Sequence, residues 1–267
     1  MESTAEIEPS PQKVDTPINS PNGSSKKVLY IVGCSVGLIV LLGLCCVLVP
    51  ALTLPAVQQM RAAAQRTVAA GNGRQLGLAI QDYYETHGKF PSASGAEGGS
   101  EMQSWRVRIL PYIMQDAVYQ EYDMGQSYDH SSNSIVKGLY IPTFQSPRGE
   151  STLDDTTHFV AVVGPNTVLT TDGKKIQRSD IKDGLTKTIM LIEYRESTLP
   201  WYQPGDVSVD EAIDIIQNAD SSGTVAIFAD GSYSMIPPSI SEKDLRALFT
   251  RNGGETISEE YLPSYDE

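Results

Sequence analysis

The feature that most constrains this sequence is an apolar run, free of charged residues, from Val28 to Val57. Its core, Val28–Val49, consists almost wholly of Val, Leu, Ile, Gly and Cys. At about 1.5 Å of rise per residue, a helix of this core would span roughly 33 Å, which matches the apolar thickness of a bilayer. The run therefore predicts a transmembrane helix, which we place at residues 28–54, with a lipid bilayer as its partner.

Two other origins of such a run fit the sequence less well. A secretory signal peptide has a shorter apolar stretch, of about 7–15 residues, close to the N-terminus. Here the run follows residues 1–27, which are rich in Ser, Pro, Asn and Glu and have the composition of a disordered tail. A buried core helix seldom extends so far without a polar position.

The charges on either side of the run predict its orientation. Lys26 and Lys27 precede it, whereas the first basic residue on the other side is Arg61. Because basic flanks stay in the cytoplasm, the tail should be cytoplasmic and the large domain extracytoplasmic. We therefore expect a single-pass protein of the bacterial inner membrane.

The rest of the chain is acidic and lacks cysteine. Cys34, Cys45 and Cys46 all lie within the apolar run, so no disulfide, thiol site or cysteine-based zinc site is expected beyond it. The chain has 33 Asp and Glu against 20 Lys and Arg, and most of this excess lies beyond residue 57. Such a charge balance repels a phosphate backbone, so we expect no nucleic-acid binding.

A second long helix is predicted for Ala56–His87, directly beyond the apolar run. Pro50 and Pro55 should kink or interrupt the helix as it leaves the membrane, and Gly73 should weaken the middle of the second helix. The distal half of this helix carries an apolar face with helical spacing, formed by Leu76, Ile80, Tyr83 and His87. Gly88 follows as a C-cap. The distal half should therefore pack against the rest of the domain.

A sheet is predicted after this helix. Short runs rich in β-branched and aromatic residues indicate four strands, at His158–Val163, Thr188–Tyr194, Thr224–Phe228 and Tyr233–Ile236. Asp230-Gly231 predicts a hairpin turn between the last two. Helical spacing also predicts a helix over Trp105–Tyr122, and Ser241 with Asp244 predicts the N-terminus of a short final helix. The pattern indicates an α+β fold, with a long helix packed on an antiparallel sheet.

Several sequence blocks occur in a recognisable order from about residue 50 to 257. They include Leu54–Arg66, Arg74–Tyr83, Gly88–Pro91, Ser104–Val107, Phe159–Pro165, Phe228–Ser232 and Leu245–Glu255. These blocks resemble the planctomycete family catalogued as domain of unknown function 1559 (DUF1559). The resemblance implies the architecture of pilins and pseudopilins, in which a membrane helix continues into a head domain. This pseudopilin-like head domain would cover residues 55–257, followed by an acidic tail at 258–267.

The sequence departs from that family at three places. A prepilin signal needs a cleavage point and a glutamate in the mature helix, and Lys27–Cys34 supplies only the basic residue. Ala69 and Gln145 stand where the family often has cysteines. The family's pattern of His, nine residues and Asp-Gly has Asp220 in place of the histidine. Prepilin processing, one disulfide and any role of that imidazole are therefore not expected.

No catalytic motif is present. The three histidines, His87, His130 and His158, lie on different predicted elements without metal-ligand spacing. Beyond the apolar run, the chain has no His-Glu-x-x-His, no Gly-x-Ser-x-Gly and no phosphate-binding Gly-rich loop. We therefore expect no enzymatic activity, no catalytic residue and no cofactor-binding residue.

Aspartates in loops and turns are the candidates for a calcium site. They are Asp154, Asp155, Asp183, Asp206, Asp220 and Asp230. The resemblance adds that related pseudopilin heads sometimes hold calcium in such loops. Tight turns also require Asp-Gly pairs whatever the function, so no position is assigned to a metal.

Trp105, Trp201 and Tyr202 allow two interpretations. Exposed aromatic side chains could stack on sugar rings, or the same residues could close the core of the domain. The sequence thus favours a structural or interaction protein of the cell envelope, which binds another envelope protein or a second copy of itself. The alternative is a surface module that binds polysaccharide or calcium through acidic and aromatic loops.

Overall fold

The structure of the protein is a computed structural model that describes residues 23–94, 103–149 and 154–263, without the side chains of residues 23–26 and 39–55. The chain divides into two compact units, Met1–Gln59 and Met60–Glu267. The expected tail 1–27 therefore lies largely outside the described residues, as do residues 264–267 of the expected acidic tail.

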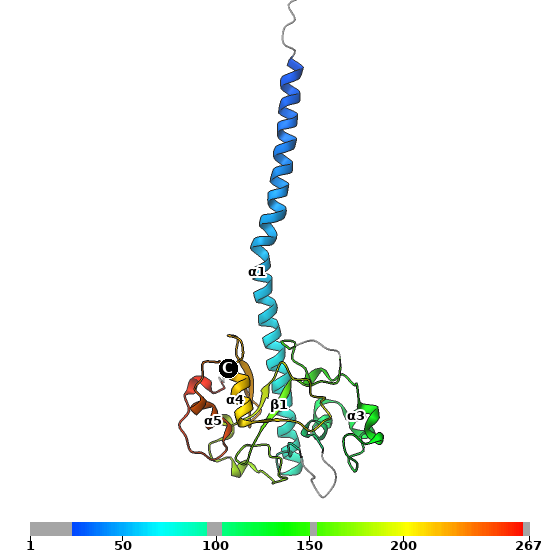
Figure 1. Ribbon diagram of the computed structural model, residues 1–267, viewed down its shortest axis with the longest axis vertical. Coiled ribbons are helices and arrows are strands. Elements are labelled where there is room, and N and C mark those ends of the chain that lie inside the picture. The colour runs from blue at the N-terminus through cyan, green and yellow to red at the C-terminus, as the bar shows by residue number, and fades with distance from the viewer. Residues whose placement is uncertain (1–22, 95–102, 150–153, 264–267) are drawn as a thin grey trace, which may run out of the picture. The chain divides into compact units, whose positions relative to one another are not determined.

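Helix α1 (Gly23–His87) is the first element and contributes residues to both units (Figure 1). The interruption expected at Pro50 and Pro55 is wrong, because α1 runs through both positions. Each proline removes only one backbone donor, and the helical turns before and after it remain.

The predicted transmembrane span, residues 28–54, stays a prediction. In the part of the chain that the structure describes, no helix is both long and apolar enough to cross a bilayer. Much of the span, residues 39–54, has side chains outside that part. Among the described side chains at its beginning, Leu29, Ile31 and Leu38 are 73%, 68% and 58% exposed.

The second unit contains a five-stranded sheet with the strand order β3-β1-β2-β4-β5. The strands are β1 (Phe159–Val163), β2 (Ile189–Glu193), β3 (Val207–Ser208), β4 (Thr224–Phe228) and β5 (Tyr233–Ile236). The four predicted strands are confirmed as β1, β2, β4 and β5, and they pair antiparallel. The fifth strand, β3, pairs parallel with β1, so the sheet is mixed and the expected purely antiparallel sheet is wrong.

Strand β3 was missed because it has only two residues and leads directly into a helix. Helix α4 (Val209–Gln217) begins at a capping box, in which the Ser208 side chain accepts from the Glu211 N–H and the Glu211 side chain accepts from Ser208. This helix also was not predicted. The parallel pairing follows from the crossover that carries the chain back beside β1.

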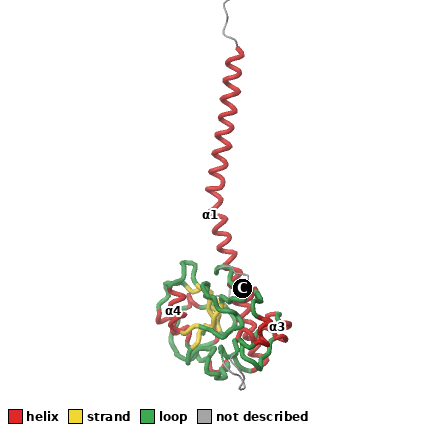
Figure 2. Tube along the Cα trace, turned by 45° about the vertical axis from the view of Figure 1, so that its right-hand side comes forward, coloured by secondary structure: helices red, strands yellow, loops and turns green. Residues whose placement is uncertain are grey.

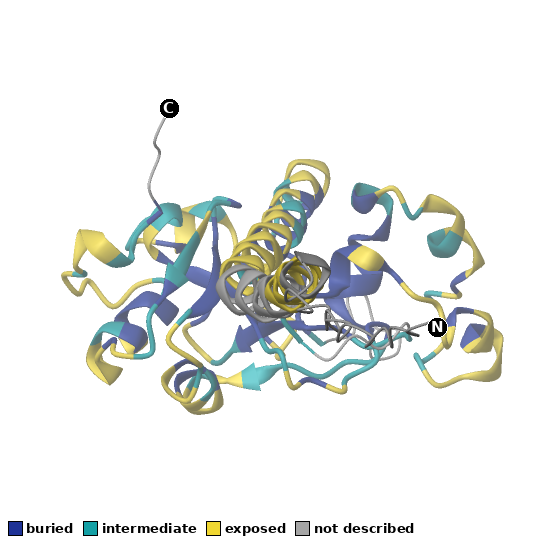
Figure 3. Ribbon diagram, turned by 90° about the horizontal axis from the view of Figure 1, so that it is seen from above, coloured by how far each residue is buried: buried dark blue, intermediate teal, exposed yellow. Residues whose placement is uncertain are grey.

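Two hydrophobic clusters cover the two faces of the sheet. Alternate strand residues such as Leu191 and Ile227 belong to the cluster that includes α1, and their neighbours Ile192 and Ala226 belong to the cluster that includes α4 and α5 (Glu242–Phe249). Figure 2 traces these short strands among long loops, and Figure 3 shows the buried residues concentrated in the strands. The fold is α+β, with α1 packed on one face of the sheet.

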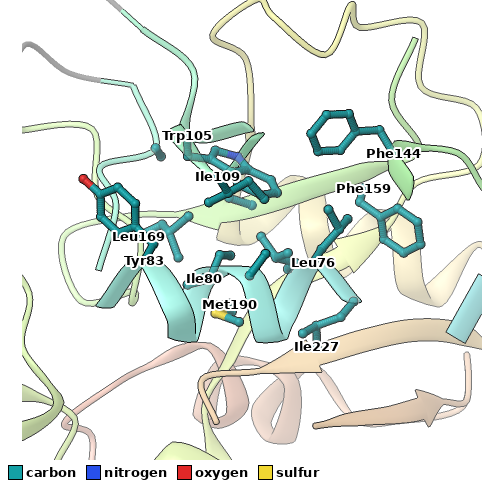
Figure 4. Packing of buried hydrophobic residues seen from close by; sticks show 14 of the residues in the cluster. Leu76, Ile80, Tyr83, Trp105, Ile109, Phe144, Phe159, Leu169, Met190 and Ile227 are labelled. Atoms are coloured by element: carbon teal, nitrogen blue, oxygen red, sulfur yellow. The ribbon is translucent and has the colours of Figure 1, made fainter. Parts of the chain in front are cut away.

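Two glycines of α1 allow the helix to approach the sheet closely. A Cβ atom at Gly73 would lie 2.9 Å from Ile227 Cδ1, and one at Gly77 would lie 2.9 Å from Gly231 Cα. Figure 4 shows Leu76 and Ile80 of the same helix within the buried cluster that also contains Ile227 and Met190. Gly73, expected only to weaken the helix, therefore also serves its packing.

The single helix predicted over residues 105–122 is wrong. The segment forms α2 (Trp105–Arg108), η1 (Leu110–Ile113) and α3 (Asp116–Glu121). Pro111 at the start of η1 removes a backbone donor, and Met114 adopts a left-handed conformation with φ of 60°. Helical spacing alone could not reveal these breaks.

The predicted caps and turns are confirmed. Gly88 has φ of 68° and its N–H donates to Tyr84 O at 2.7 Å, Gly231 has φ of 86°, and the Ser241 side chain accepts from the Asp244 N–H. The remaining elements are short 3₁₀ helices: η2 (Ser131–Val136), η3 (Pro142–Phe144), η4 (Arg178–Asp180), η5 (Leu185–Lys187) and η6 (Glu259–Tyr261).

Candidate functional site

Two arginines of the domain, Arg106 and Arg148, have side chains that are almost fully buried and paired with a carboxylate. Arg106 pairs with Asp206 in the core, and Arg148 pairs with Glu193 beside a cleft. A charge removed from water is tolerated only when it is paired and hydrogen-bonded. These two clusters are therefore the positions at which unusual chemistry could occur.

The core cluster connects three segments of the chain. Arg106 Nη2 lies 2.9 Å from Asp206 Oδ1 and 2.9 Å from Phe159 O. Asp206 Oδ1 also accepts from Trp105 Nε1 at 3.1 Å and from the Ala161 N–H at 2.7 Å. Burial raises the pKa of Asp206, and the charge of Arg106 opposes this effect. The cluster joins α2, β1 and the segment before β3.

The cleft cluster is centred on Arg148. Its Nη1 lies 2.6 Å from Glu193 Oε2, and its Nη2 donates to Ser222 Oγ and Gly223 O, each at 2.6 Å. Glu193 is buried at the end of β2, where its Oε1 accepts from Ser146 Oγ at 2.5 Å. The loop before residue 150 is thereby tied to the sheet.

Asp220 stands at the mouth of the same cleft. Its Oδ2 accepts from Arg195 Nη1 at 2.6 Å, and its Oδ1 lies 3.9 Å from Arg148 Nη2. Hydrogen bonds from Ser222 and Arg195 hold the pKa of Asp220 well below its usual range. The cleft has a volume of roughly 660 Å³, and its lining includes Asp214 of α4 and Asn218, the residue that follows this helix.

A serine, a histidine and a glutamate meet beside this cleft, but their geometry is not that of a catalytic triad. Ser146 Oγ donates to Glu193 rather than to an imidazole. His158 Nδ1 instead accepts from the Ser146 backbone N–H at 2.9 Å. Burial lowers the pKa of His158 and keeps its ring neutral. The serine hydroxyl is therefore not paired with an imidazole, as it would be in a catalytic triad.

The three histidines lie apart and have local partners. His87 stacks on Tyr83 with ring centroids 4.0 Å apart, and His130 accepts from the Ser132 N–H at the start of η2. His158 has the buried position described above. His87, at the C-terminal end of α1, thus packs on a neighbouring ring although it is exposed.

The six candidate aspartates do not form a common site. Asp183 accepts from the N–H groups of Gly253 and Gly254, and Asp155 accepts from the Gly138 N–H. Asp154 and Asp230 accept from N–H groups two residues ahead of them, as turn residues do. Across residues 23–94, 103–149 and 154–263, no group of three potential metal ligands is found.

The two tryptophans are core residues. Both are fully buried, so neither indole can stack on a sugar ring at the surface. Trp201 Nε1 donates to Leu139 O at 2.8 Å, and its ring stacks on Phe144 at 5.9 Å and meets Tyr202 edge-on. Of the two interpretations left open by the sequence, the structure supports closure of the core.

Arg106, Arg148 and Glu193 were not singled out from the sequence. The signal was present for Glu193, because it ends an otherwise apolar run, Ile189–Glu193, whose residues are all buried. Its partner Arg148 is separated from it by 45 positions, and Asp206 is 100 positions from Arg106. Spacing in one sequence does not reveal such pairs.

Comparison with known proteins gives one match. The sequence model of a family described as "Protein of unknown function (DUF1559)" matches residues 58–222, more than half of the 267-residue chain. No curated protein and no solved structure matches the chain.

Proposed function

Because this chain belongs to the DUF1559 family, whose function is unknown, we propose that it is a membrane-anchored, pilin-like structural and interaction protein of the cell envelope. Its apolar run holds it in the bacterial inner membrane with the N-terminus in the cytoplasm. Its acidic domain faces the other side, where it binds another envelope protein or a second copy of the chain. We assign it no catalytic activity.

The observation that carries this proposal is an uncovered part of α1, Met60–Val68, which we call the bare stretch. Every residue of Met60–Val68 is exposed except Ala62, which is half-buried, whereas Ala69 and Ala70 are buried. Met60 and Val68 are 63% and 51% exposed. Apolar side chains on an uncovered helix are typical of a surface that binds another molecule.

The membrane anchor is supported by composition and by exposure. Apolar side chains from Val28 to Leu38 are exposed in the described part of α1. Leaving this much apolar surface in water is unfavourable, and a bilayer would cover it. Lys26 and Lys27 at its beginning favour the cytoplasmic side for the N-terminus.

The two charged clusters support the absence of catalysis. In the core cluster the Arg106 guanidinium binds Asp206, and in the cleft cluster the Arg148 guanidinium binds Glu193. Both clusters join distant segments of the chain, as structural braces do. Neither pairs a serine hydroxyl with an imidazole.

The proposal is tested in native membranes. Alkaline extraction should leave the chain in the membrane, and protease added to spheroplasts should digest the domain beyond residue 60 but not the tail. Chemical crosslinking should then recover the chain in a complex. Release by alkali would contradict the anchor, and recovery of monomer alone would contradict the interaction role.

A further inference from the structure

Strand β5 forms one edge of the sheet, and its outer backbone groups can be identified from the hairpin. Gly231 N donates to Phe228 O and Phe228 N donates to Ser232 O, both at 2.9 Å. From Phe228 the antiparallel pairs continue as Ile227 with Tyr233 and Ala226 with Ser234. Because hydrogen-bonded and non-hydrogen-bonded pairs alternate, Ser234 bonds to β4 and Tyr233 does not.

The same alternation applies one step further along the strand. Met235 pairs with Val225, whose N–H points away from β5 and approaches Glu193 Oε2 at 3.4 Å. The N–H and C=O groups of Tyr233 and Met235 therefore point outward from the sheet. Within the described residues, no backbone hydrogen bond from another segment reaches these groups. Such an edge is a template for a further strand.

A cleft of roughly 920 Å³ lies along this edge and has room for a strand. Its lining includes Arg74 and Leu78 of α1, and Glu259 and Leu262 of the C-terminal segment. Leu78 and Tyr233 are 47% and 40% exposed. The cleft thus combines free backbone groups with apolar side chains.

The charge of the cleft indicates the kind of strand that fits. Its lining contains the acidic residues Asp230, Glu259 and Glu260 against the single basic residue Arg74. A partner with basic side chains would be attracted, and an acidic one repelled. The apolar side chains of the cleft suit a partner whose alternate residues are apolar, because successive side chains of a strand point to opposite faces.

We propose that the β5 edge binds an extended, basic segment of another protein by adding it to the sheet as a further strand. This inference rests on the proposed role as an interaction protein and specifies a binding surface and a partner class. The backbone groups of Tyr233 and Met235 supply hydrogen bonds, as in other cases of strand addition. The acidic lining selects for Lys or Arg in the partner.

The chain itself is a poor source of this strand. Residues 1–22 carry Glu2, Glu6, Glu8 and Asp15 against Lys13 alone, so their charge has the wrong sign. A second copy that paired through its own β5 would bring the acidic linings of both clefts together. Like charges placed opposite each other destabilise strand pairing. A different, basic chain is therefore the partner that the charges favour.

Proline substitutions test the edge directly. Met235→Pro removes an outward N–H and leaves the bonds to β4, so the melting temperature should change little. Ser234→Pro removes a bond to β4 and should lower the melting temperature markedly. The probes are two blocked fluorescent hexapeptides, Lys-Val-Lys-Val-Lys-Val and Glu-Val-Glu-Val-Glu-Val, added to the full chain in detergent micelles. The basic peptide should bind, and Met235→Pro should weaken it by about tenfold or more.

A charge substitution gives an independent readout that does not depend on the proline variant. Glu259→Lys should weaken binding of the basic peptide, whereas Glu121→Lys, an equal charge change at an exposed position of α3, should not. Equal binding of both peptides, or binding unaffected by both Met235→Pro and Glu259→Lys, would overturn the inference. If the native-membrane complex still forms in that case, the proposed function stands and only this binding surface is wrong.

Discussion

Two consecutive stretches of helix α1 have opposite environments within the same folded unit. Ala69–His87 lies against the sheet and contains the buried residues Leu76, Ile80 and Tyr83. Met60–Val68 belongs to the same unbroken helix, yet its side chains are exposed apart from the half-buried Ala62. The change occurs at a single residue boundary, between Val68 and Ala69.

The difference shows that the helix performs two tasks. In the packed stretch, small residues at the contact let the backbone approach the sheet, and a Cβ atom at Gly77 would lie 2.7 Å from Ile227 Cγ2. In the bare stretch, most side chains are exposed, and Ala, Gln and Arg favour the helix because they have high helix propensity. The stability of the domain should therefore depend on the packed stretch, and binding to other molecules should depend on the bare stretch.

The largest contrast should come from cavity formation. Leu76→Ala removes a fully buried side chain and should lower the free energy of unfolding by about 2–5 kcal/mol. Val68→Ala, two turns earlier on the exposed side, should change it by less than about 0.5 kcal/mol. Urea denaturation of both variants measures the contrast, and similar losses at the two positions would mean that the bare stretch is covered in the native protein.

Glycine substitutions should give effects of opposite sign. Gly77→Ala places a methyl group against Ile227 and the backbone of Gly231, which should destabilise the protein by about 1–3 kcal/mol. Gly71→Ala adds a methyl group with nothing within 4 Å and should stabilise it by about 0.5–1 kcal/mol. Thermal denaturation decides the outcome, and a gain in stability from Gly77→Ala would disprove the close approach.

Asn72 provides a third and smaller test, at the boundary between the two stretches. Its side-chain amide donates to Pro142 O at 3.1 Å and to Gln145 O at 2.8 Å. Asn72→Ala should cost about 1 kcal/mol of unfolding free energy. The matched change in the bare stretch is Gln65→Ala, for which no measurable loss is expected. A loss at position 65 as large as that at position 72 would contradict the boundary.

The smallest effect concerns pH. Burial lowers the pKa of His158 in the folded protein, so the unfolded chain binds an additional proton below about pH 6.5. The stability contributed by the neutral ring is present above that pH and is lost as the pH falls through the folded pKa. His158→Gln should make the decrease in melting temperature between pH 7 and pH 5 smaller.

The bare stretch supplies the control for this pH effect. Met60–Val68 contains no Asp, Glu or His, so Gln65→Ala should leave the pH dependence unchanged. An identical pH dependence in wild type and His158→Gln would show that the ring is not buried in a neutral form.

Local signals in the sequence accounted for much of the fold. The Asp-Gly turn, the Gly88 and Ser241 caps and four strands were predictable, because each depends on residues close together in the chain. The breaks in the helix expected after Trp105 were not predictable, because the apolar residues keep helical spacing although Pro111 and Met114 interrupt the helix. The parallel strand β3 depends on pairing with a strand more than forty residues earlier.

The candidate site was less predictable than the fold. The sequence drew attention to loop aspartates, and Asp206 and Asp220 are indeed in the two charged clusters, but as partners of Arg106 and Arg195 rather than as metal ligands. The burial of the arginines could not be predicted, because most arginines in folded proteins lie at the surface. The outward groups of β5 required the strand order and register, which no single-sequence pattern supplies.

The most direct test of the account uses a photo-crosslinking amino acid in native membranes. It is placed at Val68 in the bare stretch, or at the exposed Lys175 in a loop of the domain as a control. The account predicts a discrete crosslinked complex from position 68 and much weaker crosslinking from position 175. Recovery of monomer alone from position 68, or of the same crosslinked species from both positions, would contradict the claim that the bare stretch is an interaction surface.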